Sequence, residues 1–142
     1  MNNETVIVER NFNVPAIKVW NAITNRDEMT KWYFNLKEFK PEVGFEFRFS
    51  GGPSADRQYQ HICVVTEVEY CKKITYSWRF EGYEGISHVT FELFTGGDNQ
   101  TRLKLTHAGL ETFPNISDFA KQNFVEGWNH LLGISLQKFL EN

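Results

Sequence analysis

Apolar residues recur at helical spacing near the carboxyl end of the chain. On a helix with about 100° per residue, Phe124, Trp128, Leu132 and Ser135 fall within one broad arc, and the opposite face is polar. Ser117 can serve as the N-cap of this helix, with Asp118 in its first turn, and the helix would then extend on the order of 35 Å. An amphipathic helix of that length needs a wide apolar surface as its partner.

Two glycines interrupt this predicted helix, and each costs about 1 kcal/mol relative to alanine in a helix interior. Gly127 flanks the apolar arc, where we expect the missing side chain to let a sheet approach closely. Gly133 lies on the polar side, and the pattern offers no reason for it.

The amino-terminal pattern predicts one strand followed by two short helices. Residues 6–12 alternate apolar and polar side chains, as in a strand with one buried face. Pro15 suits the first position of a helix, because the N–H that it lacks would be unpaired there. Asn25 can cap a second short helix, whose first turn carries acidic residues that favour a helix amino terminus.

From residue 45 onward the pattern changes to a period of two, which predicts successive antiparallel strands with one apolar face. In residues 60–70 this rule selects Ile62, Val64 and Val68 as inward, and it places His61 and Cys63 on the opposite face. Turns that contain glycine, asparagine or lysine separate the segments. In the other segments, the residues expected to point inward are Phe45, Phe47, Phe49, Ile74, Tyr76, Trp78, Phe80, Val89, Phe91, Leu93, Leu103, Leu105 and His107.

The order of these elements predicts an α+β fold. One strand, two short helices, about six further strands and a long helix suit a strongly curved antiparallel sheet of about seven strands, wrapped around the carboxy-terminal helix. The length of 142 residues argues for a single domain over residues 1–142. The 13 Phe, 5 Tyr and 4 Trp more than suffice for a simple core, and this excess is compatible with an enclosed pocket.

Composition narrows the classes of function. The formal net charge is −3, and no run of five basic residues occurs, so we expect neither nucleic acid nor an anionic membrane surface as partner. Apolar runs are far shorter than the roughly 18 residues of a membrane-spanning helix, and the amino terminus shows no signal-peptide pattern. Cys63 and Cys71 are too few for a disulfide framework, so we expect a cytoplasmic protein.

Motifs for metal, cofactor and nucleophilic chemistry are missing from the sequence. The cysteines and histidines show none of the usual spacings of metal ligands. The sequence has no G-x-S-x-G elbow, no phosphate-binding loop and no dinucleotide fingerprint. We therefore expect no metal and no cofactor, and no motif names a catalytic residue.

Four stretches, in order along the chain, resemble one known family. They are VPAIKVWNAITNRDEMTKWY, KITYSW, TRLKLTHAGL and EGWNHLLGISLQKFL. They are similar to bacterial proteins related to the activator of the heat-shock-protein-90 ATPase. These belong to the helix-grip superfamily of birch-pollen-allergen and START-type lipid-transfer domains, often abbreviated SRPBCC. The resemblance covers nearly the whole chain, and it implies a seven-stranded curved sheet that grips the long helix around a hydrophobic cavity. The family name also implies a link to the stress response.

The chain departs from the family pattern in two respects. A Gly-Gly pair usually precedes the second strand, whereas this chain has the single Gly44 there. A later glycine pair lies in SGGPSADRQYQH, which we expect to form a loop near the mouth of the cavity. The eukaryotic cochaperone also carries an additional amino-terminal client-binding domain, and nothing in this sequence corresponds to it.

We predict that inward side chains of the strands and the long helix line the cavity. His107 is the sharpest candidate, because a buried neutral imidazole needs a partner on each nitrogen and a ligand can supply one. The alternative is a structural histidine whose partners are all protein groups. Core packing is likewise the alternative for each apolar residue, and a bond to a carbonyl one turn back is the alternative for Ser135. The predicted apolar wall is Phe47, Phe49, Trp78, Phe91, Phe124, Trp128 and Leu132, and the polar anchors are Tyr76, His107 and Ser135.

Three functions are consistent with these residues. We favour binding of a hydrophobic or amphipathic small molecule, such as a lipid, because inward aromatic side chains and a few polar groups are typical of ligand pockets. The resemblance also suggests a module that contacts a chaperone ATPase. A third alternative is a cyclase- or hydrolase-type enzyme, with His107 and Tyr76 or a nearby acid as a proton-transfer pair. A monomer and a homodimer both stay open.

Overall fold

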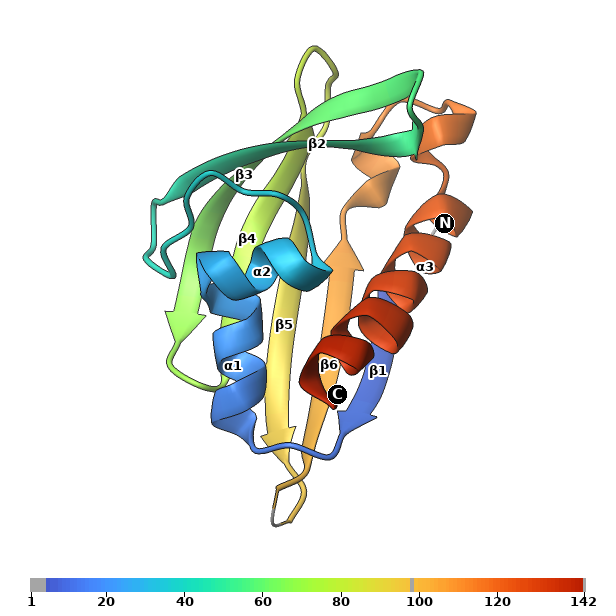
Figure 1. Ribbon diagram of the computed structural model, residues 1–142. Helices are drawn as coiled ribbons and strands as arrows, with labels where there is room; N and C mark the ends of the chain where they lie inside the picture. Colours follow the sequence, from blue (N-terminus) through green and yellow to red (C-terminus); the bar gives the residue numbers. More distant parts are fainter. Residues whose placement is uncertain (1–4, 98, 142) are drawn as a thin grey trace.

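The computed structural model describes residues 5–97 and 99–141, which form one curved antiparallel sheet with helices on its concave face (Figure 1). The α+β class is therefore confirmed. The strands are β1 (Val6–Phe12), β2 (Glu46–Ser54), β3 (Arg57–Glu69), β4 (Lys73–Phe80), β5 (Ser87–Thr95) and β6 (Thr101–Ala108). The helices are α1 (Ala16–Thr24), α2 (Arg26–Trp32), α3 (Lys121–His130), the π-helical turn η3 (Leu131–Leu136) and α4 (Gln137–Leu140), with single 3₁₀ turns η1 (Leu110–Thr112) and η2 (Ser117–Phe119).

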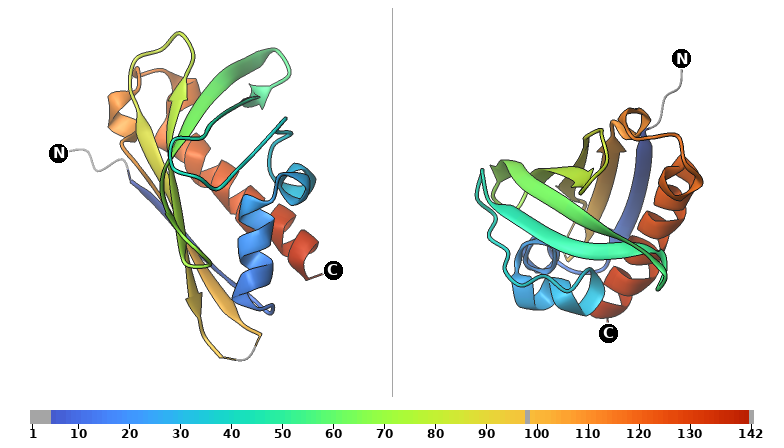
Figure 2. Two further views of the ribbon diagram at one scale, coloured as in Figure 1. Left: turned by 90° about the vertical axis from the view of Figure 1, so that its left-hand side faces the viewer. Right: turned by 90° about the horizontal axis from the view of Figure 1, so that it is seen from above.

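The strands lie in the order β1-β6-β5-β4-β3-β2, and every neighbouring pair is antiparallel. In the described part of the chain the sheet has six strands, where the sequence and the resemblance suggested about seven. Figure 2 shows that the sheet bends, so that the β2–β3 hairpin passes over the same side as the carboxy-terminal helix. This bend brings the hairpin and α3 to opposite sides of one opening.

The hairpin is longer than the sequence suggested. Most of the predicted loop SGGPSADRQYQH is strand, because β2 continues to Ser54 and β3 begins at Arg57. The two strands approach closely at Gly52, where a Cβ atom would lie only 1.8 Å from the carbonyl oxygen of Arg57. Any other residue at Gly52 would clash with that backbone, and the ladder shifts register between Gly51 and Ser54.

The predicted inward face is wrong for residues 61–64 of β3, whereas Val68, after a shift of register, does pack against the core. Cys63 pairs with Phe47 of β2 and with Trp78 of β4, and directly opposed residues of a sheet share a face. His61 and Cys63 are therefore buried, whereas Ile62 is only half-buried on the other face. Apolar side chains occur on both faces of β3, so its own alternation could not decide which face points inward.

The carboxy-terminal helix runs from Lys121 to Leu140 with a π-helical turn in its middle. Ala120 occupies the N-cap position, so the predicted N-cap at Ser117 is wrong. Ser117 instead begins the 3₁₀ turn η2, and its carbonyl oxygen accepts a 2.7 Å hydrogen bond from Nδ2 of Asn123. In the described residues, no helix is both long and apolar enough to cross a membrane. The buried residues of the long helix repeat every four positions and are Trp128, Leu132, Leu136 and Leu140.

The two helix glycines have the opposite of their expected surroundings. A Cβ atom on Gly127 would have no neighbour within 4 Å, so close approach of the sheet does not explain this glycine. A Cβ atom on Gly133 would lie 2.9 Å from Nε of Arg10. The Arg10 guanidinium covers Gly133 and donates a 3.0 Å hydrogen bond to Oδ1 of Asn129.

Candidate functional site

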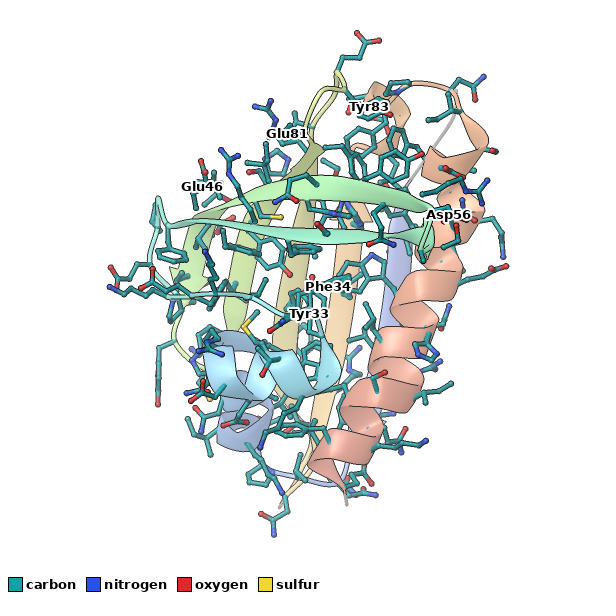
Figure 3. All side chains as sticks on the ribbon, turned by 45° about the horizontal axis from the view of Figure 1, so that its top comes forward. Tyr33, Phe34, Glu46, Asp56, Glu81 and Tyr83 are labelled. Atoms are coloured by element: carbon teal, nitrogen blue, oxygen red, sulfur yellow. The ribbon has the colours of Figure 1, made fainter. Side chains whose placement is uncertain are left out.

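A pocket of about 480 Å³ lies between the β2–β3 hairpin, the 3₁₀ turn η2 and the amino-terminal part of α3. This volume is within the usual range for small-molecule sites, about 300–1,000 Å³. Figure 3 shows Phe34 beneath the hairpin, and Asp56 at the hairpin tip beside the carboxy-terminal helix. The aromatic lining consists of Phe34, Tyr59, His61, Phe80, Phe119 and Phe124. The rest of the lining is Gly51, Gly52, Asp118, Asn123, Glu126, Gly127 and His130.

The aromatic wall is built by rings from separate segments of the chain. Phe119 of η2 stacks on Phe80 of β4, with ring centroids 4.4 Å apart, and lies 4.9 Å from the ring of Tyr59. The ring of His61 lies 4.8 Å from the ring of Phe80. Because these rings come from three different elements, the wall exists only in the folded chain.

His61 is the most buried polar side chain of the wall, with 6% of its surface exposed. Its Nδ1 lies 3.0 Å from the carbonyl oxygen of Tyr59, which can only accept, so Nδ1 carries the proton and Nε2 is an acceptor. Within the described residues, Nε2 forms no hydrogen bond. Burial lowers the pKa of His61 to about 4, against a smaller opposite effect of the Tyr59 and Phe49 carbonyls. At pH 7 the pocket therefore contains a neutral imidazole with a free acceptor.

A contact between Tyr59 and Asp118, which we call the latch, joins the hairpin to η2 at the rim. The Tyr59 hydroxyl donates a 2.5 Å hydrogen bond to Oδ2 of Asp118, and Nε of Arg57 lies 3.6 Å from the same oxygen. The hydrogen bond to Asp118 raises the pKa of Tyr59, because losing the phenol proton would leave two negative charges side by side. The latch holds the hairpin over the pocket.

His107 is buried on the inward face of β6, as its strand parity predicts, but protein groups occupy both of its ring nitrogens. Nε1 of Trp128 donates to Nδ1 at 3.1 Å, so the ring proton lies on Nε2, which is 2.7 Å from the Ser87 hydroxyl. Ser87 in turn donates to the carbonyl oxygen of Trp78 at 3.1 Å. Burial lowers the pKa of His107 to about 3. The geometry is that of a structural histidine whose partners are all protein groups.

The other predicted site residues lie mostly in the core. Trp128 packs against Trp78 and Phe91, with ring centroids 5.7 and 5.9 Å apart, and the Tyr76 hydroxyl lies 2.6 Å from that of Tyr33. Phe47, Phe49 and Leu132 are also buried, and Ser135 is half-buried in the π-helical turn η3. Phe124 is the predicted residue that lines the pocket. Ligand contact by the others stays a prediction.

Trp78 has one further property that bears on the site. Its buried Nε1 has no hydrogen-bond partner in the described part of the chain. The Trp78 ring lies directly behind His61, with ring centroids 4.9 Å apart. An unpaired buried donor is uncommon, because it costs about 1–3 kcal/mol. Trp78 does not line the pocket, so its unused donor lies behind the wall, whereas the unpartnered acceptor of His61 belongs to the wall.

Several pocket residues escaped the sequence reasoning, each for a local reason. His61 was placed on the wrong face of β3, and Asp118 was assigned to the first turn of a helix that begins later. Phe34 and Phe119 lie in irregular segments, where no periodicity indicates burial. The available signal was the glycine pair of SGGPSADRQYQH, which was expected near a cavity mouth and whose Gly51 and Gly52 do line the pocket.

Comparisons with known proteins agree with this architecture. A family model described as "Activator of Hsp90 ATPase homolog 1-like protein" matches residues 13–141. The solved structure of MLL2253 from Mesorhizobium loti is 30% identical to this chain, with a TM-score of 0.79 and a match over 96% of each chain. CV1439 from Chromobacterium violaceum has a TM-score of 0.82 at 19% identity, over 98% of each chain.

A third solved structure, DynU16 from the dynemicin biosynthetic locus, has a TM-score of 0.79 at 23% identity. The match covers 99% of this chain and 48% of DynU16, so this chain spans about half the length of that protein. A search of the curated proteins found no match. The structural matches establish the fold.

Proposed function

This chain belongs to the family of Activator of Hsp90 ATPase homolog 1-like proteins, and on that premise we propose that it binds a hydrophobic or amphipathic small molecule. The proposed binding place is the pocket beneath the β2–β3 hairpin. The observation that supports this most directly is an aromatic pocket of about 480 Å³ with a neutral, unpartnered imidazole nitrogen on its wall. Concave sites with aromatic walls and a few placed polar groups are typical of small-molecule recognition.

The predicted core residues support this site from behind. Phe49 stacks on His61 with ring centroids 4.5 Å apart, and on Phe34 with centroids 4.1 Å apart. Trp78 meets the His61 ring edge-on, with ring centroids 4.9 Å apart. We propose that this packing fixes the His61 ring, so that the apolar body of a ligand lies against the aromatic wall while its polar end stays near the rim.

A fluorescent probe tests the proposal. N-phenyl-1-naphthylamine is neutral and brightens in apolar surroundings, so a saturable fluorescence increase reports binding. Replacing Gly127 by leucine should place an apolar side chain at the rim, where a Cβ atom has no neighbour within 4 Å. We expect Gly127→Leu to weaken probe binding at least tenfold.

The matched control is Gln137→Leu, which adds an exposed leucine to the same helix away from the pocket. This variant should bind the probe like the unmodified protein. Equal binding by Gly127→Leu, or no saturable binding by the unmodified protein, would contradict the proposal.

A further inference from the structure

We infer that this pocket selects ligands whose polar end is a hydrogen-bond donor, above all a protonated amine, and that it discriminates against carboxylates. The inference rests on the proposed function and names the chemical class of the ligand. It follows from the hydrogen bonds that the polar lining residues already make with the protein.

The inner polar group of the pocket is an acceptor. His61 has 6% of its surface exposed, and its Nδ1 proton is used by the carbonyl oxygen of Tyr59. Nε2 is left with a lone pair, which can receive a proton donor but cannot donate to a carboxylate. The imidazole is neutral at pH 7, so it brings no positive charge toward an anionic group.

Most of the hydrogen-bonding capacity left at the rim belongs to acceptors. Tyr59 already donates its hydroxyl proton to Asp118, and Asn123 donates from Nδ2 to the carbonyl oxygen of Ser117. The amide of Asn123 keeps its oxygen as an acceptor and one of its two Nδ2 protons as a donor. Glu126 accepts a 3.0 Å hydrogen bond from Gln122 at Oε2, and its second carboxylate oxygen can accept a hydrogen bond from a ligand. A ligand that reaches this rim therefore meets mainly oxygen acceptors.

Apart from the histidines, the charged side chains in the described lining of the pocket are carboxylates. Asp118 and Glu126 are carboxylates, and the described lining of the pocket includes no lysine or arginine. Arg57 is near Asp118 but is not part of the lining, and 59% of its side chain is exposed, so solvent screens its charge. His130 lies at the exposed edge, where its ring can both donate and accept.

The aromatic wall favours the same ligand class. Phe80, Phe119 and Phe124 line the pocket beside these carboxylates. The faces of aromatic rings carry partial negative charge and attract cations. The carboxylates favour a cation and repel an anion, and any ring face that the ligand contacts favours a cation as well.

Three compounds with one aromatic body separate the head groups: 1-naphthylmethylamine, 1-naphthalenemethanol and 1-naphthoate. Their affinities are measured by titration calorimetry at pH 8, where His61 is neutral and the amine is protonated. At low salt we expect the amine to bind best and the carboxylate at least tenfold more weakly than the amine. The difference should shrink at 0.5 M salt, because ions screen the rim charge.

Replacing Glu126 by glutamine tests the origin of the selectivity. We expect Glu126→Gln to reduce the amine-to-carboxylate affinity ratio at least threefold. Glu42→Gln changes the net charge equally at an exposed position outside the pocket, and it should leave the ratio unchanged.

The outcomes distinguish the two proposals. Equal affinities for the three compounds, tighter binding of the carboxylate, or the same ratio in Glu126→Gln and Glu42→Gln would overturn the inference on ligand class and leave the binding function standing. No binding of any of the three compounds would overturn the proposed function itself, and the inference with it.

Discussion

His61 and His107 are both inward histidines of one sheet, yet they occupy different chemical positions. His107 is held between Trp128 and Ser87, and both of its nitrogens are satisfied by the protein. His61 has one nitrogen bonded to a backbone carbonyl, and its other nitrogen has no partner within the described residues. The free acceptor of His61 makes it the candidate for ligand contact, whereas His107 organises the core beneath the long helix.

Both histidines make stability depend on pH. Burial lowers the pKa of His61 to about 4 and that of His107 to about 3, whereas an unfolded histidine titrates near 6.5. Below pH 6.5 the unfolded chain takes up protons that the folded chain does not, so the free energy of unfolding falls as the pH falls. Each histidine should contribute a loss of about 2 kcal/mol between pH 7 and pH 5. Urea denaturation at a series of pH values measures this slope.

A His61→Phe variant isolates one of the two contributions. The new ring would pack among Phe34, Phe49 and Phe80, which already surround the imidazole. Between pH 6 and pH 5, the free energy of unfolding falls with pH partly because of the two buried histidines. We expect the variant to lose about half of that histidine-dependent fall. An unchanged slope would mean that His61 is not a buried neutral group.

For single residues, the sequence predicted which face of the sheet a side chain occupies better than it predicted that side chain's hydrogen-bond partners. The parity of β6 correctly placed His107 inward, but its partners Ser87 and Trp128 come from β5 and α3, which no local pattern relates to it. His61 was missed because the inward face of β3 is set by pairing with Phe47 and Trp78 on neighbouring strands, at the level of Cys63.

At the scale of single elements, the two glycines of the carboxy-terminal helix form a matched pair. Gly127 is exposed and has open space around it, so Gly127→Ala should raise the free energy of unfolding by about 1 kcal/mol through helix propensity alone. Gly133→Ala should stabilise less or destabilise, because the new methyl group must displace Arg10 from its hydrogen bond with Asn129. Urea denaturation of both variants provides the test, and a larger gain from Gly133→Ala would contradict the assigned contacts.

The β2–β3 hairpin yields a second prediction at this scale. Tyr59→Phe removes the hydroxyl of the latch to Asp118 while keeping the ring against Phe119. We expect backbone amides near the hairpin tip, residues 51–59, to exchange with deuterium several-fold faster, because fewer contacts then hold the tip against η2. Exchange in β5 and β6 should not change.

Tyr83→Phe is the control for the latch. Tyr83 is exposed, its ring lies 5.7 Å from that of Tyr59, and its hydroxyl makes no hydrogen bond in the described part of the chain. Equal acceleration at the hairpin tip in both variants would show that ring packing, and not the hydroxyl bond, holds the hairpin.

Element order was predictable because the apolar period changes clearly along the chain, and Asn25 does cap α2 by accepting a hydrogen bond from the backbone N–H of Glu28. Element ends were less predictable. Ser117 and Asp118 have the composition of a helix start, but the chain first makes a 3₁₀ turn there, and the Asp118 side chain bonds Tyr59 across the pocket. Asp118 therefore makes a contact with a residue that is distant in sequence, although its local sequence is typical of a helix start.

At the scale of the whole molecule, the curved sheet and the long helix follow from the pattern, but the location of empty space does not. The aromatic composition predicts how much apolar surface is available, not how the rings fill the space between sheet and helix. Trp128 packs there against both Trp78 and Phe91. The pocket lies instead under the hairpin, whose position depends on the bend of the sheet and on the latch.

The central claim is that a small molecule binds under the hairpin and not among the packed rings of the core. The most direct measurement is a titration with neutral 1-naphthalenemethanol, followed by backbone amide ¹H–¹⁵N correlation spectra. We predict saturable shifts that are largest at Gly51, Gly52 and Gly127, which line the pocket. Largest shifts at Phe91 and Leu132 in the core, or no saturable shifts at all, would contradict this account.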